Sequence, residues 1–154
     1  MQNSISLHKP RRLASLLLFA LVASLVSACS ATSSQPDMSA MKMAPLTSLP
    51  VNVQQAPVSV RQAYQFAAAN PDLLKQVPCY CGCGAMGHTS NYACYVSAQN
   101  SDGSLSFDSH ALGCSICVDI TQDAMRLLGR GKSVPEIRSY VDSTYAKYGP
   151  SNMP

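Results

Sequence analysis

The sequence predicts a mainly α-helical fold: a small helical bundle that carries a long cysteine-rich loop, with a short β-hairpin inside the loop. Two observations lead to this expectation. Apolar residues recur at three- and four-residue steps near both ends of the region 58–149, which is the period of an amphipathic helix. Between those stretches, residues 77–113 are rich in glycine and serine and hold most of the cysteines.

Residues 1–28 have the features of a cleavable export signal. A basic stretch with Lys9, Arg11 and Arg12 precedes residues 13–26, an apolar run without charge. That run is shorter than the roughly 20 apolar residues of a membrane-spanning helix, so it is typical of a signal-peptide core. Arg11 and Arg12 leave a twin-arginine signal open as an alternative, although the flanking residues match that motif poorly.

The end of the apolar run resembles the bacterial lipobox. Residues 25–29 read Leu-Val-Ser-Ala-Cys, a branched apolar residue and two small ones just before a cysteine. We therefore expect lipidation of Cys29 and an exported protein anchored to a bacterial membrane. Because Ser30 is not aspartate, this is the outer membrane, facing the periplasm, if the cell is Gram-negative. The alternative is an ordinary signal peptide cut near Ala28.

Cleavage also removes the apparent basicity of the chain. Three of its 11 lysines and arginines leave with the signal, and the remaining eight equal its eight acidic residues. The mature net charge is therefore zero, which gives no reason to expect a nucleic-acid partner. The expected partner is the membrane, through the lipid.

Residues 29–57 have the composition of a flexible tether between lipid and domain. Prolines recur among Ser, Ala, Gln and Thr, and only Asp37 and Lys42 are charged, so we expect no core here. Met38, Met41 and Met43 lie close together and are soft donors for Cu(I), but no His or Cys accompanies them, and ordinary linker composition is the preferred interpretation.

The folded domain is expected over residues 58–149, with 150–154 as a tail. Residues 60–69 predict a first helix, and Asn70 followed by Pro71 predicts an N-cap and a short helical turn through Gln76. A second helix with an apolar face follows Cys117 and ends at Gly129 and Gly131. Ser133 and Glu136 then form the pattern of a capping box. The last helix carries an apolar stripe and ends at Gly149, the stripe consisting of Val134, Ile137, Val141, Tyr145 and Tyr148.

A β-hairpin is expected between the helices. Residues 91–96 and 105–107 flank the turn-forming residues 100–103, Asn-Ser-Asp-Gly.

The chemistry of the domain rests on six cysteines, an even number, which in an exported protein is compatible with three disulfides. Cys79, Cys81 and Cys83, however, are too close in sequence to pair comfortably with one another. Gly82 and Gly84 allow positive φ, so their sulfurs can curl around one ion. Cys114 and Cys117 share a helix face and can complete such a site or occupy a second one. The candidate ligands of a Cu(I) or Zn(II) ion are Cys79, Cys81, Cys83, Cys94, Cys114, Cys117, His88 and His110.

Residues 78–83, Pro-Cys-Tyr-Cys-Gly-Cys, are the defining hexapeptide of the PCYCGC-motif lipoproteins, and the chain resembles that family over nearly the whole domain. The similarity also includes Tyr64, Asn70-Pro71, Gly87-His88, Asn91, Cys94, Phe107-Asp108, His110, Gly113-Cys114, residues 117–120, Gly131-Lys132 and residues 136–138. The resemblance implies metal binding at the Cys and His positions and no settled enzymatic activity.

A weaker similarity links the last two helices to the thiol-reductase component of cytochrome c maturation. It rests on Cys114 and Cys117 in a CxxC pattern, on residues 131–133, on Glu136-Ile137 and on Tyr148-Gly149. It implies that Cys114 attacks disulfides while Cys117 resolves the intermediate. No hydrolase constellation or phosphate-binding loop is present in the sequence. Three hypotheses stay open: a metal-binding lipoprotein, which we favour, a disulfide-stapled module, and a thiol–disulfide oxidoreductase.

Overall fold

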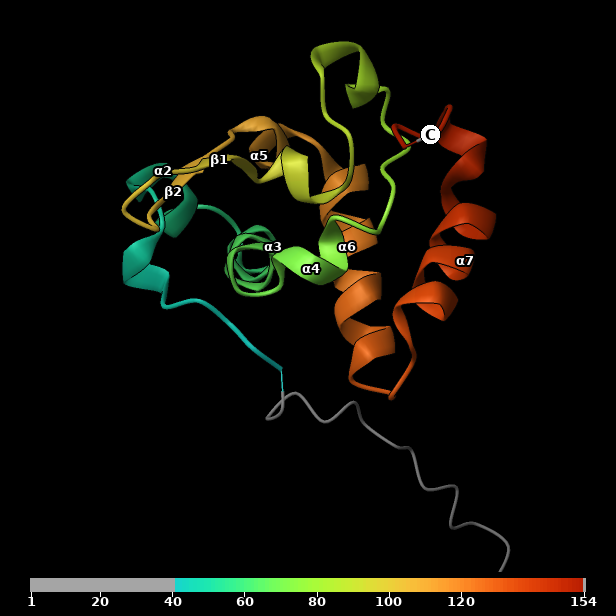
Figure 1. Ribbon diagram of the computed structural model, residues 1–154, viewed down its shortest axis with the longest axis horizontal. Helices are drawn as coiled ribbons and strands as arrows, with labels where there is room; N and C mark the ends of the chain where they lie inside the picture. The colour runs from blue at the N-terminus through green and yellow to red at the C-terminus, as the bar shows by residue number, and fades with distance from the viewer. Residues whose placement is uncertain (1–40, 154) are drawn as a thin grey trace, which may run out of the picture. The chain divides into compact units, whose positions relative to one another are not determined.

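The computed structural model describes residues 41–153, which fold mainly as helices with one small antiparallel sheet (Figure 1). This confirms the predicted fold class. The longer elements are α3 (Val58–Ala69), α6 (Ser115–Leu128) and α7 (Val134–Tyr145). The shorter ones are α2 (Val51–Gln54), α4 (Pro71–Leu74), α5 (His110–Gly113), β1 (Val96–Gln99), β2 (Leu105–Phe107) and the 3-10 helices η3 (Leu46–Ser48), η4 (Cys83–Met86), η5 (Tyr92–Cys94) and η6 (Ala146–Tyr148). Within the described residues, no helix is both long enough and apolar enough to span a membrane.

Helix α6 forms the centre of this unit. It packs against α3 on one side and α7 on the other, and α3 runs across it, seen end-on in Figure 1. Its buried face includes Cys117, Ile120, Ala124 and Leu127, which repeat at the helical spacing read from the sequence. α3 buries Tyr64 and Phe66 against it. One continuous apolar core therefore lies around α6.

The helix ends follow from their capping residues. Gly131 has φ 75°, a left-handed conformation that suits glycine, and the chain turns there from α6 into α7. Ser133 and Glu136 form the expected capping box. Asn70 stands where the N-cap of α4 was predicted, but its side chain instead donates back to the carbonyl of Phe66. Tyr148 was expected in the buried stripe of the last helix; it lies in η6 and is 53% exposed, so that part of the prediction is wrong.

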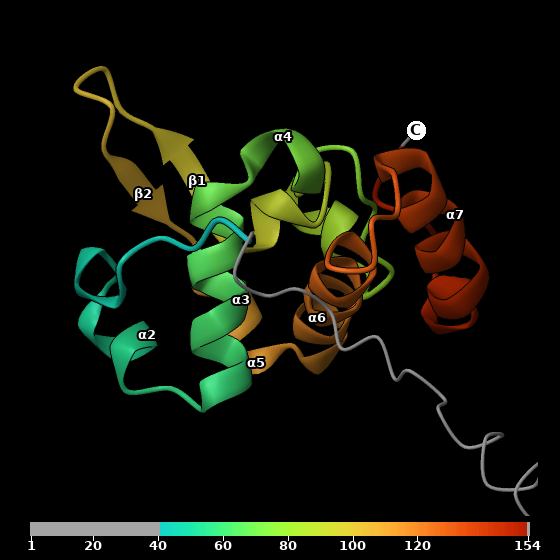
Figure 2. The ribbon, with the colours of Figure 1, turned by 90° about the horizontal axis from the view of Figure 1, so that it is seen from below.

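The predicted hairpin is present but shorter than expected. β1 and β2 are antiparallel, with Val96 opposite Phe107, and they project from the helices (Figure 2). The first strand begins at Val96, not at position 91, because η5 precedes it. The adjacent residues Cys94 and Tyr95 are both 0% exposed, whereas successive side chains of a half-buried strand point to opposite faces.

The domain begins before residue 58, so the expected tether boundary at 57 is wrong. Leu49 and Val53 are only 4% and 1% exposed, and the backbone amide of Ala44 donates to the carbonyl of Gln65 in α3. Met41 and Met43 pack against the core. Residues 1–40, with Cys29 and Met38, lie outside the described part of the chain.

The prolines of this segment explain why its composition misleads. Pro45, Pro50 and Pro57 each stand at the N-cap of a helix, before η3, α2 and α3. Proline tolerates this place because its missing N–H has no helical partner there. The prolines thus start short helices, and the segment docks through the buried side chains of Leu49 and Val53 and through hydrogen bonds between Ala44 and Gln65.

We predict that Val53→Ala destabilises the domain by about 2 kcal/mol, because it removes two buried methyl groups. Val51→Ala is the matched control, since Val51 lies in the same helix and is 66% exposed. Urea unfolding of both variants measures the difference. Equal midpoints for the two variants would mean that α2 is not part of the core.

Candidate metal centre

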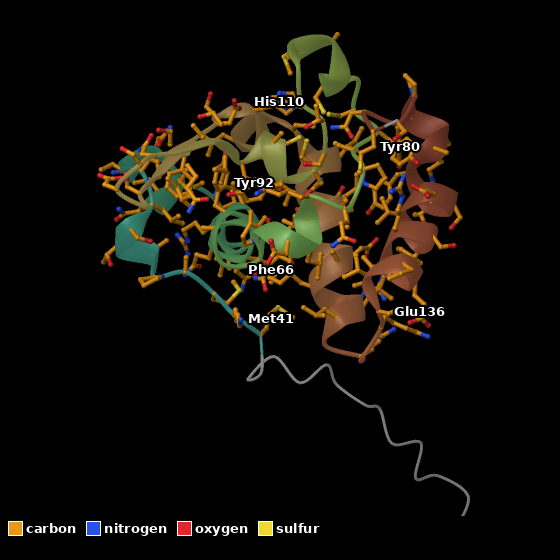
Figure 3. The ribbon with its side chains drawn as sticks, viewed as in Figure 1. Met41, Phe66, Tyr80, Tyr92, His110 and Glu136 are labelled. Atoms are coloured by element: carbon orange, nitrogen blue, oxygen red, sulfur yellow. The ribbon has the colours of Figure 1, made fainter. Side chains whose placement is uncertain are left out.

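All eight Cys and His residues proposed as ligands meet in one cluster. They come from the loop that holds the hexapeptide, from η4 and η5, and from α5 and the start of α6. Figure 3 shows His110 near sulfur atoms at this end of α6. The donor atoms fall into four overlapping groups, and in each group they all lie within 4.8 Å of one another. The described residues can therefore hold a metal ion here.

The loop geometry explains how alternate cysteines converge. Gly82 has φ 81°, which is the left-handed conformation expected there, and the chain turns at once into η4. Gly84 does not share this role: it lies inside η4, where an added Cβ would approach the Cβ of Asn152 to 3.4 Å. Gly87, with φ 88°, supplies the second left-handed turn. The prediction was correct for Gly82 and wrong for Gly84.

The sulfur atoms lie in contact but are not paired. None of the six cysteines that the structure describes forms a disulfide. The Sγ of Cys117 lies 3.2 Å from that of Cys114, 3.5 Å from Cys79 and 3.6 Å from Cys81. Cys83 and Cys94 are 3.6 Å apart. Four sulfurs around a tetrahedral zinc, with bonds of about 2.3 Å, are about 3.8 Å apart, so these sulfurs need to separate only slightly to hold an ion.

The two histidines lie next to each other in the cluster, their rings 5.1 Å apart in a T-shaped arrangement. Nε2 of His110 lies 3.4 Å from the Sγ of Cys81. Nε2 of His88 lies 3.5 Å from Asp108 Oδ2, and its Nδ1 is buried without a hydrogen-bond partner among the described residues. A carboxylate on one ring nitrogen and a free second nitrogen is the usual arrangement of a metal-binding imidazole.

Asp108 positions both histidines. While one carboxylate oxygen lies near His88, the other accepts the backbone N–H of His110 at 2.7 Å and so orders the start of α5. Its own carbonyl oxygen accepts a hydrogen bond from the hydroxyl of Tyr64 at 2.7 Å. The sequence placed Asp108 within a family motif but gave it no role.

Electrostatics prevent all the thiols from ionising together. Hydrogen bonds from Cys117 and Cys94 lower the pKa of Cys79, which makes it the preferred thiolate. Burial, and then the charge of Cys79, raise the pKa of Cys81 and of Cys83. Hydrogen bonding to Cys79 raises the pKa of Cys117 as well. A bound cation would reverse this balance, because it compensates the charge of the thiolates that ligate it.

A buried polar network fixes the position of Cys117. Its carbonyl oxygen accepts hydrogen bonds from the Tyr95 hydroxyl at 2.7 Å and from the Asn91 amide at 3.3 Å. The Thr121 hydroxyl lies 2.7 Å from Asn91 Oδ1 and 2.8 Å from the Tyr95 oxygen. Asn91, Tyr95 and Thr121 are fully buried. Sequence reasoning missed this network, because Thr121 and Tyr95 resemble ordinary core positions.

The C-terminal residues also belong to the site, and the expectation of a free tail is wrong for residues 151–153. Asn152 Oδ1 accepts the backbone N–H of Cys79 at 2.6 Å, and its own backbone N–H donates to the Cys79 carbonyl. Its Nδ2 lies 3.4 Å from the Sγ of Cys83. Tyr80 donates to Asp142 of α7 at 2.7 Å, and Figure 3 shows it beside that helix. No signal in the sequence connects position 152 with the hexapeptide.

A family model described as "Protein of unknown function with PCYCGC motif" matches residues 18–154. The chain belongs to this PCYCGC-motif family. No curated protein and no solved structure matches it, and the similarity to the thiol reductase of cytochrome c maturation is not shown. The PCYCGC hexapeptide supplies three of the eight clustered donors, so the family motif and the site coincide.

We predict that Tyr95→Phe lowers the free energy of unfolding by about 1–2 kcal/mol, because the Cys117 carbonyl loses its shortest side-chain donor in a buried place. Tyr92→Phe serves as the control. Tyr92 is also buried, but its hydroxyl makes no hydrogen bond within the described residues. Denaturant unfolding of both variants gives the comparison. A loss as large for Tyr92→Phe would assign the effect to packing and not to the network.

Proposed function

We propose that this domain binds a soft metal ion, Cu(I) or Zn(II), outside the cytoplasm and close to a membrane. The observation that carries the proposal is the convergence of six unpaired cysteines and two histidines from separate segments. Thiolate and imidazole together suit Cu(I) and Zn(II), whereas hard ions prefer oxygen ligands. All the ligand atoms of the ion would then come from side chains of this domain.

The pattern of contacts favours an ion over structural disulfides. A sulfur in a disulfide needs one partner, but the Cys117 sulfur contacts three others within 3.6 Å, and Cys81 contacts Cys79, Cys117 and His110. Such many-sided contact is what a chelate requires, because each ligand atom must face the same point. The buried Nδ1 of His88, which has no hydrogen-bond partner within the described residues, is also explained if it ligates the ion.

A thiol–disulfide oxidoreductase remains the second candidate, and the geometry of the CxxC pair favours it. Cys114 is the N-cap residue of α6, and its sulfur lies 3.2 Å from that of Cys117, so the two sulfurs are neighbours, as a redox-active CxxC pair requires. The four remaining cysteines have no role in that chemistry. Cys117 is also fully buried, which hinders its exchange with a substrate protein.

We further propose that Cys29 carries a lipid that anchors the domain to a bacterial membrane, facing the periplasm from the outer membrane if the cell is Gram-negative. Support comes from the basic stretch, the short apolar run and the lipobox-like residues 25–29. The anchor would keep the metal centre close to the membrane surface, within reach of ions that cross it.

We predict that Cys81→Ser lowers metal content and melting temperature together. Loss of one thiolate ligand lowers the affinity for an ion that binds, and so stabilises, only the folded protein. A Cu(I) or Zn(II) chelator should lower the melting temperature of the wild type and much less that of the variant. Metal analysis and thermal unfolding of anaerobically purified protein provide the measurement. Met86→Leu is the control, since Met86 is an exposed sulfur in the same loop.

The alternatives give distinct results in the same experiment. A disulfide-stapled module would ignore the chelator and lose stability on reduction. An oxidoreductase would lose disulfide reduction in Cys114→Ser but not in Cys81→Ser. A protein that carries no metal, takes up neither ion at micromolar concentration and shows three disulfides resistant to mild reductant would rule out the metal proposal.

We predict that Cys29→Ala leaves the chain without acyl groups and unprocessed by the lipoprotein peptidase. Intact-mass spectrometry and membrane fractionation test this, with Ser30→Ala as the neighbouring control. Acyl mass should be present in the wild type and in the control. A wild type without acyl mass, or a Cys29→Ala variant that fractionates like the wild type, would refute the anchor.

A further inference from the structure

We infer that the eight donors form a polynuclear centre with at least two ion positions, and this inference rests on the metal-binding function proposed above. The outer position has four donors: Cys81, His110, Cys114 and Cys117. The inner position has three donors of its own, Cys83, His88 and Cys94, and their group also includes His110, which lies within reach of both positions. Cys79 lies between the two and links them.

The grouping of the donors supports two positions. No single one of the four groups contains all eight donor atoms, whereas the outer and inner positions together take in seven of them. Tetrahedral coordination uses only four, so one ion would leave half of the cluster without a role. The inner position also has its own indication of a ligand, because the buried Nδ1 of His88 has no hydrogen-bond partner in the described chain.

Cys79 is placed to connect the two positions. Its sulfur lies 3.4 Å from Cys81 and 3.5 Å from Cys117, both in the outer position. It also belongs to the groups that contain Cys94 and Cys83, from the inner position. A thiolate sulfur has several lone pairs and can bridge two ions. Cys79 is fully buried, and its backbone is held on both sides by Asn152, so the bridging atom is fixed.

Charge balance points the same way. Six ligating thiolates carry six negative charges, of which one Cu(I) or Zn(II) compensates one or two. The uncompensated remainder would be costly in a cluster whose cysteines are mostly buried. A second ion reduces the uncompensated negative charge of the thiolates. Loading is not a redox step: each S–H bond breaks, a metal–sulfur bond forms, and the proton passes to the buffer.

The two positions differ in their access to solvent. The outer position has three partly exposed donors, Cys81, Cys114 and His110, beside the buried Cys117. The inner position has one partly exposed donor, His88, beside Cys83 and Cys94, which are 1% and 0% exposed. The outer ion should therefore load last and leave first, and the inner ion should be retained. A chain built in this way exchanges one ion with a carrier while a second keeps the site assembled.

Native mass spectrometry of the reduced chain, purified anaerobically in the form the cell produces and titrated separately with Cu(I) and with Zn(II), tests this inference. The wild type should bind at least two ions. Cys114→Ser should lose the outer ion and keep the inner one, His88→Gln should do the reverse, and Met86→Leu should bind like the wild type. Limiting chelator should remove ions from the wild type in two phases, and only the slow phase should remain in Cys114→Ser.

The outcomes separate this inference from the function on which it rests. A wild type that binds no ion overturns the proposed function. A wild type that binds a single ion leaves the function standing and overturns the second position. Loss of all metal in both Cys114→Ser and His88→Gln, with circular dichroism showing both variants folded, would mean one indivisible site and would also overturn it.

Discussion

The carbonyl oxygen of Cys117 is the point on which the architecture depends. Tyr95 and Asn91 donate to it from the loop before the hairpin, and Thr121 closes the network from α6. These groups are fully buried, so each unmet hydrogen bond would be costly. The network therefore locks a loop with little regular structure onto the central helix. Because Cys94 directly precedes Tyr95, the hydrogen bonds from Tyr95 and Asn91 to the Cys117 carbonyl also bring Cys94 of the loop close to Cys117 of α6.

A second constraint closes the site from the other end of the chain. Asn152 pairs with the backbone of Cys79 in both directions. Gly149 also approaches the Tyr80 carbonyl closely, so that an added Cβ would lie only 3.0 Å from its oxygen. The Tyr80 hydroxyl then fixes the same loop to α7. The hexapeptide is held by helices that follow it by more than fifty residues. Such support preorganises ligands before any ion arrives.

The elements predicted well were those whose signal is local. The capping box at Ser133, the end of α6 at Gly129 and Gly131, and the hairpin turn all depend on neighbours in sequence. The predictions failed where tertiary contacts outweighed composition. Residues 41–57 resemble a linker by composition, but Leu49 and Val53 find a place in the core. Gly84 resembles a turn glycine, but it lies inside η4 beside Asn152 and does not have a positive φ.

By itself, the sequence determined the mainly helical fold and the identity of the candidate ligands, because helix periodicity and the donor chemistry of Cys and His are properties of the residues themselves. Only the tertiary structure decided which donors meet. It brought Cys79 to Cys117, Cys83 to Cys94 and both histidines to one cluster, and it recruited Asp108 and Asn152 as supports. Such pairings join positions far apart in the chain, and their geometry depends on how the helices pack.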